Sequence, residues 1–241
     1  MNLKRVLRKL VYKITGKSRY ESSEAYVNYL RSKGVKIGEG TIVNSPKNIQ
    51  VDITRPELLE IGKRVLLHRG TVIMTHDFAS RVFVNKYNDF VPSHGKIKIG
   101  DNVWLGEHVT ILKDVEIGDN VIIGSGAVVT KSIPSNSVAV GIPARVVCSL
   151  EDYYNKRKEK MVDEAIEYAL AIYAAGRIPT VSDFDDDYPT FVDGSNYQEY
   201  NYPYMKVFKT EQFEEWKKNH KAPFHGFEEF MKYVEQKRGS R

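Results

Sequence analysis

Three side chains of this 241-residue sequence could do chemistry on a bound molecule. His76 lies in the run Thr75-His76-Asp77, and an imidazole, with an ordinary pKa of about 6.5, can remove a proton at neutral pH. Lys131 and Arg145 are cations of the kind that a polyphosphate needs, since a guanidinium forms a fork that fits a phosphate. Taken singly, they also fit a surface histidine, a solvated lysine and an arginine that closes a turn. The elements that position them decide between these interpretations.

Those elements follow from an aliphatic residue that recurs at every sixth position between residues 97 and 133. A period of six fits neither a helix, with about 3.6 residues per turn, nor the alternation of a strand, with a period of about 2. It is the period of a chain coiled into a triangular prism, with about six residues on each side and the aliphatic residue pointing inward. The two series are Ile99, Leu105, Ile111, Ile117, Ile123 and Val129, and Ile97, Val103, Val109, Val115, Val121, Ala127 and Ile133.

A prism of this kind predicts a repeat of eighteen residues, and the sequence contains one. The motif Ile-Gly-Asp-Asn-Val occupies residues 99–103 and returns at residues 117–121. Gly, Asp and Asn directly after the inward residue suit the corners, where the backbone can need a positive φ. The region is therefore predicted to be a parallel β-helix of the hexapeptide type, which makes the chain mainly β.

Three further motifs in this region indicate a family. They are Val103-Trp104-Leu105-Gly106, Val129-Thr130-Lys131 and Gly141-Ile142-Pro143-Ala144-Arg145. Together with the hexads, they resemble the C-terminal half of the hexapeptide-repeat acetyltransferases, a family that includes galactoside, maltose and polysaccharide O-acetyltransferases. The resemblance covers about residues 22–148. It implies a left-handed parallel β-helix, an exception to the usual right-handed crossover.

The resemblance implies that His76 is the catalytic base, because in this family a histidine leaves the prism just before an extended loop. Transfer of an acetyl group from a thioester to a sugar hydroxyl requires removal of the hydroxyl proton as the oxygen attacks. Direct attack needs no covalent intermediate if both substrates are held together. Asp77, which could orient the imidazole, and His94, within the loop, are the candidate acceptor contacts. Adjacent residues on an extended chain point opposite ways, so the role of Asp77 stays open.

The resemblance also implies a surface for acetyl-CoA as the co-substrate, with no metal. An extended pantetheine arm would lie along the later coils and exchange amide hydrogen bonds with them. The implied contacts, from the thioester toward the nucleotide, are Trp104, Gly124, Ser125, Thr130, Lys131 and Arg145. Cys148 stands where the family can place another cation, and the sequence departs from the family pattern at that contact.

Residues 1–34 are predicted to form two helices. The first, over residues 3–14, is basic and amphipathic, which fits either an anionic membrane surface or packing on the protein itself. The second runs from Ser23 to Ser32, with a serine as its N-cap and Gly34 as the stop. It is expected to cap the open end of the β-helix, because exposed strand edges invite unwanted pairing.

The period of six is interrupted twice. It holds from Ile37 to Ile49, breaks at residues 55–56, and resumes in the same frame at Ile61. A second break needs an insertion at residues 78–95, whose composition is that of a loop. Long ordered loops are disproportionately functional, so the acceptor is expected near this insertion.

The β-helix domain is predicted to span residues 35–148, followed by a helical C-terminal extension over residues 149–241. Spacing and stop signals place helices at about residues 151–176, 211–219 and 226–236. The extension lies outside the family resemblance. It is expected to cover the end of the prism or a neighbouring chain.

The composition limits the function classes. The net charge is +5, but residues 1–20 carry seven basic and no acidic residues, so the rest of the chain sums to −2 and no nucleic acid is expected as a partner. A single cysteine excludes an internal disulfide and fits a reducing compartment. Without a signal peptide or a run of about twenty apolar residues, a cytoplasmic location is expected. Peripheral membrane contact through residues 1–20 stays open.

These features predict an acetyl-CoA-dependent O-acetyltransferase that acts on a sugar or a surface-glycan precursor and works as a homotrimer, as the family resemblance implies. N-acetylation of an amino sugar, or acetylation of a drug, is the nearest alternative. A metal-dependent carbonic anhydrase on the same coil would need three imidazoles, which His68, His76 and His94 could supply. A non-catalytic scaffold is the remaining alternative.

Overall fold

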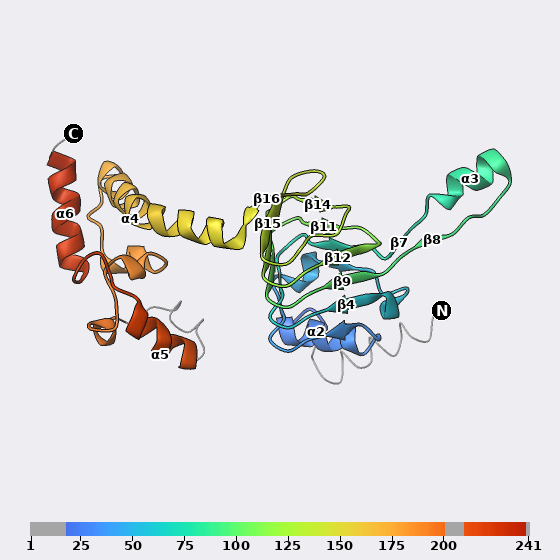
Figure 1. Cartoon of the computed structure of the whole chain (residues 1–241), viewed down its shortest axis with the longest axis horizontal. Coiled ribbons are helices and arrows are strands. Elements are labelled where there is room, and N and C mark those ends of the chain that lie inside the picture. The colour runs from blue at the N-terminus through green and yellow to red at the C-terminus, as the bar shows by residue number, and fades with distance from the viewer. Residues whose placement is uncertain (1–17, 201–209, 240–241) are drawn as a thin grey trace. The chain divides into compact units, whose positions relative to one another are not determined.

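The computed structural model describes residues 18–200 and 210–239 of the chain (Figure 1). The amphipathic helix predicted over residues 3–14 lies outside the described residues. The chain divides into two compact units, residues 1–153 and residues 154–241, and each is described by itself.

The first unit is a coil of short parallel strands that form three sheets, which are the three sides of a prism. Sheet A contains β1 (Lys36–Ile37), β4 (Leu59–Ile61), β9 (Ile97–Ile99) and β12 (Val115–Ile117). Sheet B contains β2 (Ile42–Val43), β5 (Leu66–Leu67), β10 (Val103–Leu105), β13 (Val121–Ile123), β15 (Ser137–Val140) and the antiparallel β16 (Arg145–Ser149). Sheet C contains β3 (Gln50–Val51), β6 (Val72–Ile73), β11 (Thr110–Ile111) and β14 (Val128–Val129).

The predicted repeat of eighteen residues is confirmed by the strand register. Val103 lies beside Val121, and Thr110 lies beside Val128, each pair eighteen residues apart. All members of the two aliphatic series between residues 97 and 133 are buried. The predicted corner chemistry is also present, because Asn102 and Asn120 both have a positive φ and are joined by an amide hydrogen bond of 2.8 Å.

The strand register of the first coil differs from the prediction on one side of the prism, sheet C. On sheet B, Val43 lies beside Leu67, as the preserved frame predicts. On sheet C, however, it is Val51 that lies beside Ile73, so the prediction that Ile49 keeps the frame was wrong. The reason is a short 3-10 helix, Pro46–Asn48, which follows a left-handed residue and lengthens this corner by two residues.

The insertion after β6 contains more structure than the loop that its composition predicted. It begins and ends with the antiparallel pair β7 (His76–Asp77) and β8 (Ser93–His94), and it holds a helix, α3 (Ser80–Tyr87). Figure 1 draws α3 at the tip of this hairpin, away from the three sheets. Most of its side chains are exposed, Val82 by 63%, so α3 packs little against the core of the prism.

The predicted cap of the prism is confirmed. Helix α2 (Ser23–Arg31) begins after Ser22, whose side chain accepts a hydrogen bond from the Ala25 amide, and the chain turns at Gly34 with φ 103°. A left-handed turn of this kind favours glycine. The helix buries Tyr26, Val27 and Leu30 in the same core as the first coil.

The second unit has a separate, aromatic core. Its elements are the remainder of α4 (Leu150–Ala174), three 3-10 helices (Val181–Phe184, Tyr188–Thr190 and Tyr197–Glu199), α5 (Thr210–Asn219) and α6 (Phe227–Gly239). These bounds confirm the three predicted helices to within three residues. Phe184, Phe191 and Phe230 are fully buried at its centre. None of the helices in the described part of the chain has the length and apolar character needed to cross a bilayer.

Candidate active site

Two corners of the prism hold the residues singled out by the sequence. The histidine corner is defined as the residues that connect sheet C to sheet A, 52–58, 74–96, 112–114 and 130–132. The pocket corner is defined as the residues that connect sheet B to sheet C, 44–49, 68–71, 106–109 and 124–127.

His76 is held at the start of the insertion by a carboxylate. Its Nδ1 lies 2.5 Å from Oδ2 of Asp52, a residue of the coil before it. An ionised carboxylate can only accept, so Nδ1 carries the hydrogen and Nε2 keeps a free lone pair. The His76 side chain is 22% exposed, which leaves the ring reachable from solvent. This arrangement is that of a general base with an orienting anion.

Asp52 is ionised and nearly buried, with its side chain 9% exposed. Its Oδ1 accepts hydrogen bonds from the amide and hydroxyl of Thr54, and its Oδ2 accepts from the amide and hydroxyl of Thr75. Burial alone would raise the pKa of the Asp52 carboxyl, but the bonds from the two threonines and from His76 outweigh it and hold that pKa well below its usual range. The anion beside the imidazole is therefore permanent at physiological pH.

Sequence reasoning missed Asp52 because it considered only the neighbours of His76 along the chain. Asp52 and His76 follow sheet C at the same corner in successive coils, because Val51 lies beside Ile73. A search for carboxylates at this corner of the preceding coil could therefore have found Asp52.

Asp77 contacts other partners. Its carboxylate accepts hydrogen bonds from Lys113 Nζ at 2.7 Å, Ser93 Oγ at 2.9 Å and the Ala79 amide at 3.0 Å. The bond from Lys113 is the largest cause that lowers the pKa of Asp77 to about 2. The imidazole of His76 is thus oriented by Asp52, while Asp77 joins the base of the hairpin to the prism. An acceptor contact through Asp77 stays a prediction.

His94 lies directly opposite His76 in the β7–β8 pair and is exposed. Thr130 and Lys131, which follow β14, are exposed at the same histidine corner two coils later. The structure therefore brings both candidate acceptor contacts, Asp77 and His94, and two of the predicted donor contacts to the corner that carries the candidate base.

The other predicted donor contacts lie elsewhere on the prism. Trp104, in the middle of sheet B, is 37% exposed and lies between Leu66 and Ile122. Gly124 and Ser125 belong to the pocket corner. Arg145 begins β16, and its guanidinium is exposed and donates to the carbonyl of Ala144.

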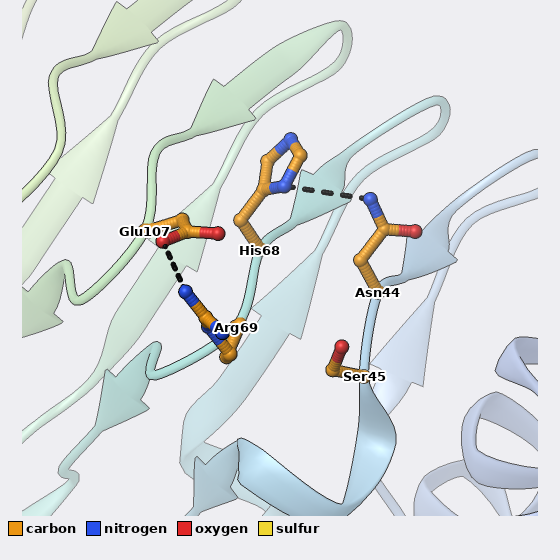
Figure 2. A pocket seen from close by; sticks show the side chains of 5 residues that line it. All are labelled: Asn44, Ser45, His68, Arg69 and Glu107. Carbon is orange, nitrogen blue, oxygen red and sulfur yellow. Dashed lines mark hydrogen bonds and ion pairs between the residues drawn. The ribbon is translucent and has the colours of Figure 1, made fainter.

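The pocket corner contains a cavity of about 250 Å³ that the sequence did not indicate (Figure 2). Its lining is polar and consists of Asn44, Ser45, His68, Arg69 and Glu107. Asn44 Nδ2 lies 3.4 Å from His68 Nδ1, and Arg69 forms an ion pair of 2.9 Å with Glu107. The His68 ring also meets the Trp104 ring edge-on, with 5.3 Å between centroids. His68, which the sequence offered only as a ligand of the alternative zinc site, therefore links this cavity to a predicted donor contact.

Within one chain, the candidate base His76 and the donor contact Trp104 do not lie together. In a three-sided prism, the corner between sheets C and A lies opposite sheet B, so His76 and Trp104 are on different sides. For the same reason His68, at the pocket corner, does not converge with His76 and His94. The three imidazoles that a carbonic-anhydrase site would need are therefore not brought together within one chain.

Known proteins resemble the prism portion of the chain. A family model described as bacterial transferase hexapeptide (six repeats) matches residues 96–131. Protein CapG of Staphylococcus aureus is 40% identical over 131 residues, which cover 53% of this chain and 73% of the relative. Galactoside O-acetyltransferase of Escherichia coli K12 is 32% identical over 152 residues, which cover 61% of this chain and 71% of the relative.

Solved structures also match part of the molecule. The hexapeptide-repeat acetyltransferase VCA0836 of Vibrio cholerae is 28% identical, with a TM-score of 0.40, over 48% of this chain and 62% of that chain. The match therefore spans less than two thirds of that protein. A second structure of VCA0836 is a complex with acetyl coenzyme A.

Proposed function

Because the chain belongs to the hexapeptide-repeat acetyltransferases, whose prism is a left-handed parallel β-helix, we propose that it transfers acetyl from acetyl-CoA to a hydroxyl of a sugar or glycan precursor. Family membership makes the chain an acyltransferase. The donor, the acceptor class, the base and the assembly are the proposal. The observation that carries it is the bond of 2.5 Å between His76 and the ionised Asp52.

The proposed reaction is a direct transfer. His76 Nε2 takes the proton of the acceptor hydroxyl while the oxygen attacks the thioester carbonyl. The carbon–sulfur bond then breaks, and the proton passes from the imidazolium to the departing sulfur, which leaves as free CoA. The Asp52 carboxylate stabilises the imidazolium that exists between these two proton transfers. No step requires an enzyme nucleophile, since holding the two substrates close together accelerates the direct transfer.

The donor contacts are proposed on exposed side chains. The partly exposed Trp104 would lie near the thioester end, and the corner residues Gly124 and Ser125 near the pantetheine arm. Lys131 and Arg145 carry the exposed charges for the phosphates of acetyl-CoA. Thr130, next to Lys131, adds a hydroxyl to the same surface.

The assembly proposed is a homotrimer with the site between chains. His76 and Trp104 lie on different sides of one prism, so a complete site needs the histidine corner of one chain and the sheet B side of another. Sheet B also presents apolar side chains outward, with Ile42 48% exposed and Val147 58% exposed. Exposed apolar residues of this kind are typical of a surface that a partner covers.

The polar cavity at the pocket corner, which only a neighbouring chain of the trimer would bring to His76, supports a neutral, hydroxyl-rich acceptor. An amide, a hydroxyl and an imidazole line it (Figure 2), and such groups both donate and accept hydrogen bonds, as sugar hydroxyls require. The positive charge of Arg69 is already matched by Glu107 at 2.9 Å. An anionic sugar would face that carboxylate, so a neutral sugar is favoured.

The test is a screen of acceptors with the full-length chain. Neutral sugars, uronic acids, amino sugars and lipid-linked glycans are each incubated with acetyl-CoA, thiol release is followed, and the product is identified by mass spectrometry. We expect an O-acetylated neutral sugar. An N-acetylated product, or acetyl-CoA binding without transfer to any acceptor, would overturn the proposal.

A further inference from the structure

Two consecutive residues of strand β7 form side-chain bonds to two different coils of the prism. His76 is bonded to Asp52 in the coil before it, at 2.5 Å. Asp77 is bonded to Lys113 in the coil after it, at 2.7 Å. Consecutive residues of a strand point to opposite faces, so the two bonds hold the strand from opposite sides.

The Asp77 carboxylate accepts hydrogen bonds from three separate parts of the chain. Lys113 belongs to the turn after β11, Ser93 lies on β8, and the Ala79 amide precedes α3. The side chains of Asp77 and Lys113 are 35% and 28% exposed, so water screens the pair only in part. The low pKa of Asp77, about 2, keeps the carboxylate charged at any working pH. Both strands of the hairpin and the prism therefore meet at this one carboxylate.

The rest of the hairpin packs against little that could fix its orientation relative to the prism. Val82 and Tyr87 of α3 are each more than 60% exposed, and β7 and β8 pair over only two residues. A two-stranded ribbon of this length is marginal by itself. The direction in which β7 leaves the prism thus depends on the bonds at its base.

From this geometry we propose that Asp77 and Lys113 are positioning residues for the transfer, which hold the His76 ring against Asp52 by fixing the exit of β7. The inference rests on the proposed role of His76 as the base. Loss of the Lys113 charge removes the bond that holds β7 on the side of Asp77. The His76 ring is then no longer aligned for its hydrogen bond with Asp52. A displacement of about 1 Å at such a group can lower a rate by about a hundredfold.

The experiment compares Lys113→Met with a matched control, Lys98→Met. Lys98 pairs with Glu116 across adjacent coils at the same 2.7 Å, but on sheet A and with no bond to the hairpin among those described. We expect Lys113→Met to lower kcat by about ten- to a hundredfold with the KM for acetyl-CoA unchanged. Lys98→Met should leave both unchanged. Lys113→Arg, which restores the charge, should recover most of kcat, and Asp77→Asn should resemble Lys113→Met.

A second readout follows His76 itself and needs no acceptor. Diethyl pyrocarbonate modifies neutral imidazoles, and mass spectrometry of the His76 peptide gives the modification rate as a function of pH. We expect the pH dependence of this rate to change in Lys113→Met and Asp77→Asn, while Lys98→Met matches the parent chain.

Equal kcat and equal His76 reactivity in Lys113→Met and Lys98→Met would overturn the inference. Full turnover by His76→Ala would instead overturn the proposed base, and the reactivity measurement would still decide whether the Asp77–Lys113 pair positions the ring.

Discussion

The early and late coils of the prism are built from the same sheets but differ at their corners. In the late coils, sheet C is joined to sheet A by three residues, 112–114, and the neighbouring strands β11 and β14 are eighteen residues apart. In the early coils, the same connection takes residues 52–58 and then residues 74–96. Asp52, His76 and Asp77 all lie within these two longer connections. The regular coils thus supply the frame, and the longer corners supply the candidate chemistry.

The difference shows why a β-helix can carry a site without losing its core. The register of sheet B is maintained across the insertion, because Leu67 still lies beside Leu105. Both side chains are at most 1% exposed. Extra residues at a corner leave the inward positions in place, since surface connections tolerate insertion better than packed strands do. Chemistry and stability should therefore be separable by mutation.

The largest effect is expected from His76→Ala, in the early coils. Loss of a general base lowers kcat by about 10²- to 10⁴-fold. The fold and the affinity for acetyl-CoA should be unchanged, because His76 is at the surface and contributes no core packing. Thiol release with the acceptor found in the screen measures kcat, and calorimetry measures donor binding.

Val82→Ala is the control for this variant, since Val82 lies on α3 of the same insertion, is 63% exposed and has no proposed role in the reaction. A similar loss of kcat in both variants would mean that the hairpin, rather than the His76 imidazole, was disturbed. Retained turnover in His76→Ala would remove the assignment of the base.

The next effect is on stability, and it is expected in the late coils. Ile111 is fully buried between Ile73 and Val129 in sheet C, so Ile111→Ala should lower the free energy of unfolding by about 2–5 kcal/mol. Val51→Ala, on the edge strand of the same sheet and only partly buried, should cost less. Urea unfolding at fixed protein concentration, followed by Trp104 fluorescence in a Trp216→Phe background, reports on the prism alone. Equal losses would mean that the early and late coils are packed alike.

These two regions also differ in how far the sequence could predict them. The coils from residue 97 to residue 129 were predicted residue by residue, because each inward aliphatic residue follows from one period. In the last coil the separation falls to sixteen residues, so Ile133 lies beside Ile117 rather than Val115. The early coils were predicted less well, since the two extra residues at Pro46–Asn48 move Val51, rather than Ile49, beside Ile73. Composition did not reveal α3, because the asparagine, aspartate, proline and glycine residues of the insertion are typical of loops.

For the site, the sequence could nominate His76 by family resemblance, but its partner Asp52 required knowledge of which residues one coil apart touch. The pocket corner was missed for the same reason, as Asn44, His68 and Glu107 come from three successive coils. A local motif marks such residues poorly, because their neighbours in space lie a whole coil away along the chain.

A smaller effect on catalysis is expected from Asp52→Asn. The amide preserves the shape but removes the anion that faces His76 Nδ1 at 2.5 Å. We expect kcat to fall by about ten- to a hundredfold through misplacement of the ring. An unchanged kcat would show that Asp52 serves the fold alone.

The same substitution tests the pH dependence of stability. The folded protein holds the Asp52 pKa below its ordinary value of 3.8, so the folded state binds fewer protons there than the unfolded chain. The stabilisation is therefore complete above about pH 4 and is lost as the pH falls further. Asp52→Asn should flatten the decline of the prism's unfolding free energy below pH 4, measured by urea titrations at several pH values. A decline as steep as that of the parent chain would assign the acid sensitivity to other groups.

The smallest effect is expected from Lys131→Ala, in the late coils. Lys131 is exposed at the histidine corner, and an exposed charge pair contributes up to about 1 kcal/mol. The KM for acetyl-CoA should therefore rise by at most about fivefold, with kcat unchanged, and the difference should shrink as salt screens the charges. Lys63→Ala is the matched control, because Lys63 is also exposed but lies at the third corner, between sheets A and B. If Lys131→Ala and Lys63→Ala give the same KM at low salt, the late coils do not hold the phosphates at this corner. The donor must then be sought along sheet B, beside Trp104.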